Sequence, residues 1–77
     1  MKREFVRSRS IRSIGYDHAN KILEIEFRNG SRVYQYYGVP FDIYQMLMTA
    51  DSMGTFVNQV IKTFPYQEIV DDLVHPA

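Results

Sequence analysis

An Asn-Gly pair at positions 29 and 30 constrains the fold more than any other feature of the sequence. Asn-Gly favours a tight hairpin turn, because both central positions of that turn need a positive φ. Before the pair, apolar and charged residues alternate over residues 21–28, which predicts a strand with one buried and one solvated face. After it, residues 31–39 are rich in aromatic and β-branched side chains, which predicts a second strand. We therefore expect a β-hairpin at the centre of the fold.

The length of the hairpin loop decides which residues of the two strands share a face. A two-residue loop, which we favour, puts Tyr34 opposite Ile25 and Tyr36 opposite Leu23. Both tyrosines are then core residues on the apolar face. The other face would carry Val33, Gln35, Tyr37 and Val39 with Glu24 and Glu26. A three-residue loop would reverse the whole assignment.

An earlier strand is expected over residues 8–16. Ile11 and Ile14 are three residues apart, so they would face opposite sides of a regular strand. A β-bulge near Ser13 or Gly15 would bring both isoleucines to one face. Residues 1–7 are polar and charged, and we expect them to form a flexible basic N-terminus.

Helical spacing follows Pro40, which can start a helix because its missing N–H is not needed there. The first helix is expected over residues 41–50 and the second over residues 53–64, with Ser52 as its N-cap. Residues 66–74 repeat helical spacing in an acidic segment, which predicts a short C-terminal helix or an interaction tail. The predicted fold is α+β: a three-stranded antiparallel meander packed on two helices, with a short C-terminal helix, in one domain over residues 1–77.

The composition limits the class of protein. Seventy-seven residues make one domain at most. The chain contains no cysteine, which excludes disulfides and thiolate metal sites and is compatible with a cytoplasmic location. No apolar run is long enough to span a bilayer, and the basic N-terminus lacks the apolar segment of a signal peptide.

The zero net charge conceals an uneven distribution. Residues 1–40 hold eight basic and four acidic residues, whereas residues 41–77 hold one basic and five acidic residues. The basic half could meet an acidic partner. Alternatively, the two halves attract each other or a neighbouring copy, and we favour this simpler explanation.

Catalytic constellations are absent from the pattern. His18 lies in a predicted turn and His75 near the C-terminus, with no nucleophile or metal-ligand set around either. Asp71 and Asp72 are adjacent, so on a helix they would point apart. We predict no enzyme activity, no metal and no cofactor.

An ordered set of residues resembles the KTSC domain family: Ser10-Ile11, Ile14-Gly15-Tyr16-Asp17, residues 23–27, Gly30, Tyr34-Gln35-Tyr36, Val39-Pro40, Leu47, Ala50, Ser52, Gly54, Phe56, Asn58 and Ile61. The resemblance covers residues 8–66 and leaves residues 67–77 outside it. The family is named for the C-terminus of certain lysyl-tRNA synthetases and includes stand-alone bacterial and phage proteins. The resemblance therefore implies RNA or tRNA as a partner, with Tyr34 and Tyr36 as the family's Tyr-x-Tyr motif.

Binding of RNA or another single-stranded nucleic acid is the first hypothesis, because the family context and the basic half of the chain agree. Single-stranded binders combine cations along the backbone with aromatic side chains for the bases. The candidate contacts are Arg7, Arg9, Arg12, Arg32 and Tyr37.

A protein-interaction module is the second hypothesis. An amphipathic helix, an exposed sheet edge and an acidic tail could support a homodimer or an adaptor for a larger bacterial or phage protein. Plain packing in the core accounts for most of residues 53–64, so the tail is the stronger candidate for this role.

Overall fold

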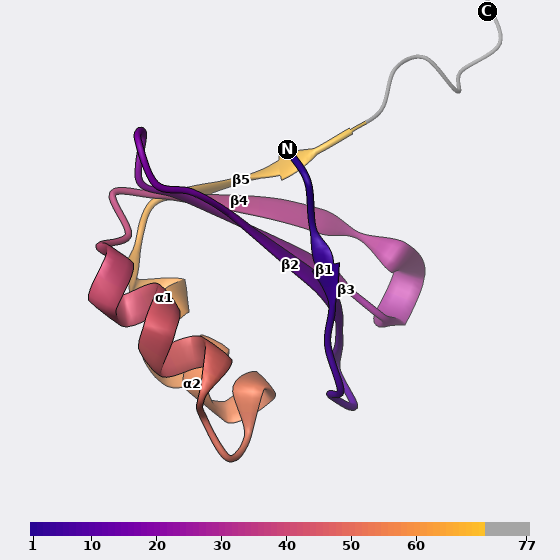
Figure 1. The fold of residues 1–77 in the computed structure, drawn as a ribbon. Helices are drawn as coiled ribbons and strands as arrows, with labels where there is room; N and C mark the ends of the chain where they lie inside the picture. Colours follow the sequence, from indigo (N-terminus) through magenta and orange to yellow (C-terminus); the bar gives the residue numbers. More distant parts are fainter. Residues whose placement is uncertain (71–77) are drawn as a thin grey trace, which may run out of the picture.

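The computed structural model describes residues 1–70. Five strands form one antiparallel sheet in chain order. Both α-helices lie on the same face of this sheet (Figure 1). The elements are β1 (Glu4–Phe5), β2 (Ile11–Asp17), β3 (Ile22–Phe27), the 3-10 turn η1 (Asn29–Ser31), β4 (Val33–Tyr37), α1 (Phe41–Met48), α2 (Met53–Gln59), the 3-10 turn η2 (Ile61–Thr63) and β5 (Tyr66–Ile69).

The α+β class and the two helices are confirmed, but the prediction of three strands is wrong. Strand β1 forms within the segment expected to be flexible, and it pairs with β2. Residues 66–69 form strand β5 instead of the start of a helix, and they pair with β4. The edge of β4 supplies unpaired backbone groups, and hydrogen bonding to them outweighs a short helical pattern. The rest of the predicted C-terminal helix lies outside the described residues.

The predicted register of the central hairpin is confirmed, although its loop is longer than expected. Tyr34 pairs with Ile25 and Tyr36 with Leu23. The loop contains four residues, closed by the Phe27 N–H, which donates to the Arg32 carbonyl at 2.8 Å. Lengthening the loop by one residue on each side leaves the register unchanged, so every side chain keeps the face assigned to it.

The expected bulge in β2 lies between Ile11 and Ser13, and both Ile11 and Ile14 are buried. Gly15 has a different role from a bulge residue. A Cβ atom there would lie 2.6 Å from the carbonyl oxygen of Lys2. The glycine therefore lets the N-terminal segment pass close over the sheet.

The second helix is shorter than predicted. It ends at Gln59, and η2 continues its apolar stripe, so that Val57 and Ile61 are both buried. Ser52 is its N-cap as expected, with its Oγ accepting a hydrogen bond from the Thr55 N–H at 3.3 Å.

Val39 was assigned to the solvated face, and this prediction is wrong. Its side chain is fully buried. The strand has already ended at Tyr37, and Gly38 has a φ of 74° that turns the chain toward the helices. Pro40 then serves as the N-cap of α1. The core between sheet and helices is formed by Ile11, Ile14, Leu23, Ile25, Tyr36, Val39, Leu47, Val57 and Ile61.

Candidate functional site

A groove of about 660 Å³ opens between η1, η2 and the sheet. Figure 1 shows that the end of the sheet that carries η1 extends beyond the two helices. Apolar side chains of β3 and β4 at this end are therefore incompletely covered. The groove is lined by Phe27, Tyr34, Tyr36 and Tyr66, by the basic residues Arg32 and Lys62, and by Ser10, Asn29 and Gly30.

The aromatic side chains form a connected group. The rings of Phe27 and Tyr34 meet edge to face with centroids 5.7 Å apart. The Tyr66 ring lies 5.7 Å from both Tyr34 and Tyr36. Tyr66 is 58% exposed, whereas Tyr36 is 2% exposed. The group therefore runs from a buried floor to an accessible ring at the rim.

Burial determines the protonation state of Tyr36, the buried ring of this aromatic group. It raises the pKa of the Tyr36 hydroxyl to about 12, and the neighbouring Tyr34 and Tyr66 add to this effect. Tyr36 is thus a neutral phenol at physiological pH. The confirmed assignment of Tyr36 to the core contrasts with Tyr34, which is only partly buried and faces the groove.

Two basic side chains line the groove. Arg32 directly follows η1, where Gly30 has a φ of 76° that L-residues adopt at a cost. Lys62 lies in η2, on the helical side. Within residues 1–70 neither side chain forms an ion pair. Glu68 lies opposite Tyr34 in the sheet register but does not line the groove.

A second hollow of about 420 Å³ adjoins the first, because Ser10 lines both. It lies between the segment that joins β1 to β2 and the segment that joins α1 to α2. Arg7 and Arg9 line it, and Asp51 supplies a carboxylate. The structure thus brings three of the predicted basic residues, Arg7, Arg9 and Arg32, to two neighbouring hollows.

Arg12 and Tyr37 lie elsewhere. The Arg12 Nε is 4.0 Å from a carboxylate oxygen of Glu26, and the Tyr37 hydroxyl donates to Gln35 at 3.1 Å. Both partners belong to the face of the sheet opposite the helices. Neither predicted contact residue therefore reaches either hollow.

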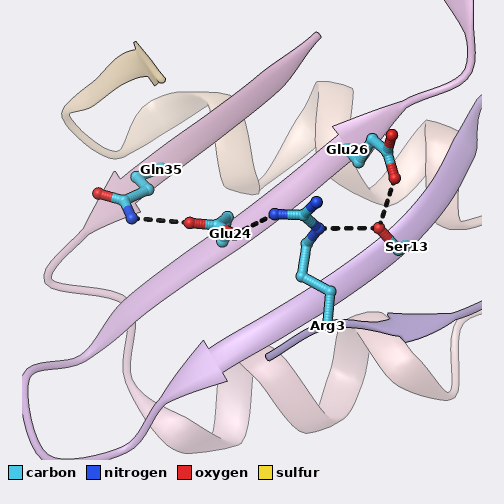
Figure 2. A network of polar contacts seen from close by, with 5 residues as sticks. All are labelled: Arg3, Ser13, Glu24, Glu26 and Gln35. Carbon is cyan, nitrogen blue, oxygen red and sulfur yellow. Dashed lines mark hydrogen bonds and ion pairs between the residues drawn. The ribbon is translucent and has the colours of Figure 1, made fainter. Parts of the chain in front are cut away.

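That opposite face carries a polar network instead of a solvated surface (Figure 2). The Arg3 guanidinium contacts Glu24 and donates to the Ser13 hydroxyl at 3.0 Å. Ser13 donates to Glu26 at 2.8 Å, and the Gln35 amide donates to Glu24 at 2.7 Å. Glu24 is only 5% exposed, so its charge is compensated within the sheet. This closed network leaves little polar capacity for a ligand.

The sequence pattern does not mark three of the groove residues as site residues. Helical spacing places Tyr66 in the predicted C-terminal helix and Lys62 in the predicted second helix. Phe27 was assigned to the apolar face without regard to whether a helix covers it. Tyr66 and Ile69, the apolar residues of this segment, are three positions apart, so no alternation marks the strand that carries Tyr66 to this face.

Among residues 1–70, no group of three or more His, Asp or Glu side chains could hold a metal ion. The helices of this same part of the chain are too short or too polar to cross a membrane.

The sequence profile of the KTSC domain matches residues 7–66. The chain belongs to the KTSC domain family. The match includes every residue that lines the two hollows, from Arg7 to Tyr66. Strand β1 lies before it, and most of β5 lies after it.

Relatives of this KTSC domain agree with that assignment. The crystal structure of a KTSC domain protein from Yersinia pestis matches with a TM-score of 0.85 and 46% identity, over 90% of this chain and 97% of the other. An uncharacterized protein from Stutzerimonas stutzeri is 46% identical over 87% of this chain and 93% of its own length. A protein from Tsukamurella paurometabola is 42% identical over 74% and 84%, respectively. The KTSC assignment thus rests on both sequence and fold.

Proposed function

We propose that this KTSC domain is a binding module for single-stranded nucleic acid, with RNA as the first candidate, and that the groove between η1 and η2 is its binding site. The observation that carries the proposal is the combination of an exposed ring, Tyr66, with two cations, Arg32 and Lys62, at one opening. Stacking on an aromatic ring binds any base, because every base has a π-face. A nearby cation binds the phosphate of the same nucleotide.

The energies are sufficient for weak, sequence-tolerant binding. A base stacked on an aromatic side chain contributes about 1–3 kcal/mol. Each phosphate contact with a single strand also makes the affinity depend on salt, with a slope of about −0.7 in the logarithmic plot. Arg32 and Lys62 can both supply such contacts, since neither forms an ion pair among the described residues.

The test is the binding of a fluorescent single-stranded RNA at a series of salt concentrations, measured by anisotropy. Lys62→Gln should weaken binding and reduce the salt slope by about 0.7. Lys21→Gln is the matched control, since it removes the same charge at the opposite end of β3. Tyr66→Ala should weaken binding without changing the slope. Absence of binding at low salt, or equal losses from the two lysine variants, would overturn the proposal.

Self-association is the second candidate, and strand β5 favours it. In the described part of the chain, β5 pairs only with β4, so one edge of this strand is open. Open edges support pairing between chains. Two copies would pair β5 against β5 and extend the sheet. Sedimentation over a range of concentrations tests this proposal, and a monomer at all concentrations would refute it.

A further inference from the structure

The two hollows meet at Ser10, and their chemistry differs. The larger one contains four aromatic side chains and two cations. The smaller one contains no aromatic ring, but it has two arginines and three serines. The first therefore suits a base with its own phosphate. The second suits a stretch of sugar and phosphate whose base is not held.

The cations that line the two hollows come from distant parts of the sequence. Arg7 and Arg9 precede β2, Arg32 follows η1, and Lys62 lies in η2. No ion pair within residues 1–70 engages any of these four side chains. A polyanion that leaves the aromatic groove past Ser10 would therefore next meet Arg7 and Arg9.

We propose that the two hollows are one track for a short oligonucleotide, with one nucleotide stacked in the aromatic groove and the adjoining phosphate or phosphates bound by Arg7 and Arg9. This inference rests on the proposed function and adds a minimum ligand length to it. A mononucleotide fills only the aromatic groove. A strand of several nucleotides occupies both hollows and binds more tightly.

Asp51 is the residue that opposes this arrangement. Its carboxylate lines the second hollow and repels a phosphate there. Removal of its charge should strengthen binding of an oligonucleotide and leave binding of a mononucleotide unchanged. Asp51→Asn thus tests the track with a gain of affinity, which a misfolded variant could not produce.

The experiment compares uridine monophosphate with a six-nucleotide oligouridine, using the full-length protein and calorimetry or anisotropy competition. The double substitution Arg7→Gln and Arg9→Gln should lower the affinity for the hexanucleotide about tenfold. It should also reduce the salt slope by about 1.4, because two phosphate contacts are lost. The mononucleotide affinity should change less than about twofold by the same reasoning. The matched control is Arg12→Gln with Lys21→Gln, which removes two charges outside both hollows.

The outcomes distinguish a failure of the nucleic-acid function from a failure of the two-hollow track. If neither ligand binds, the nucleic-acid function itself is refuted. If both bind equally tightly, or the Arg7 and Arg9 variant loses no more affinity than the control, the groove remains a nucleotide site and the track is refuted. A hexanucleotide affinity that Asp51→Asn leaves unchanged or lowers would also overturn the track.

Discussion

Tyr34 and Tyr36 show how two residues on the same face of one strand acquire different roles. Both point to the apolar face of the sheet, because each pairs with an isoleucine or leucine of β3. Both line the groove, but Tyr36 belongs to the core shared with the helices and is buried, whereas Tyr34 lies nearer η1 and is only partly buried. Coverage by the helices, and not the face alone, separates a core ring from an accessible one.

The raised pKa of Tyr36 predicts a loss of stability at high pH. The folded state holds the hydroxyl protonated up to about pH 12, whereas an unfolded tyrosine ionises near pH 10. The contribution of this group is therefore fully present below about pH 10 and is lost as the pH rises toward 12. Urea unfolding from pH 8 to 12 should show a steeper decline for the native protein than for Tyr36→Phe. Parallel declines in the two proteins would contradict the assignment.

A methyl group at position 15 should destabilise the protein. Gly15→Ala places a Cβ atom 2.6 Å from the Lys2 carbonyl oxygen, so the N-terminal segment must move. We expect a loss of about 2 kcal/mol in the free energy of unfolding, as for other overpacked sites. In a chain that lacks residues 1–6 the same substitution should cost far less. An equal cost in both chains, measured by urea unfolding, would place the strain elsewhere.

At the scale of elements, the edge strand β1 holds the preceding segment, with Lys2 and Arg3, over the sheet. It pairs with β2, and it brings Arg3 to the buried carboxylate of Glu24. The network in Figure 2 joins Arg3, just before β1, to β2, β3 and β4 through side chains, in addition to the backbone hydrogen bonds of the sheet. Loss of Arg3 would leave Glu24 as an uncompensated charge in a nearly closed environment.

Arg3→Ala should therefore lower the free energy of unfolding by about 2 kcal/mol. Lys2→Ala is the control, since Lys2 is exposed and contributes no side-chain contact to the network. Glu24→Gln introduced together with Arg3→Ala should recover part of the loss, because it removes the unpaired charge. A double-mutant cycle by chemical unfolding measures the coupling, and additive effects would rule out a direct interaction.

At the scale of the whole molecule, sheet and helices share one core, so they should unfold together. Leu47 of α1 is fully buried against the sheet residues of this core. Leu47→Ala should lower the free energy of unfolding by about 3 kcal/mol. Gln45 lies on the same helix but is exposed, so Gln45→Ala should change the free energy of unfolding by less than about 0.5 kcal/mol. Far-ultraviolet circular dichroism and tyrosine fluorescence should report one transition. Separate transitions would mean that the helices form an independent unit.

Much of the central fold could be predicted from the sequence. Alternation over residues 21–28 and the Asn29-Gly30 turn identify the hairpin, and the register follows from the requirement that apolar side chains share a face. The bulge in β2 follows from the spacing of Ile11 and Ile14. The two edge strands could not be predicted in this way. They are short and mostly exposed, so no apolar alternation marks them.

The sequence by itself determined the three central strands, the faces of the central hairpin, the Ser52 cap and the family. Each depends on local rules of backbone geometry or on the period of apolar residues. The groove was decided only by the tertiary structure, because it depends on where the helices stop covering the sheet. Lys62 and Arg32 are thirty residues apart in the chain. Only the tertiary fold brings them, with Tyr66, to the lining of one groove.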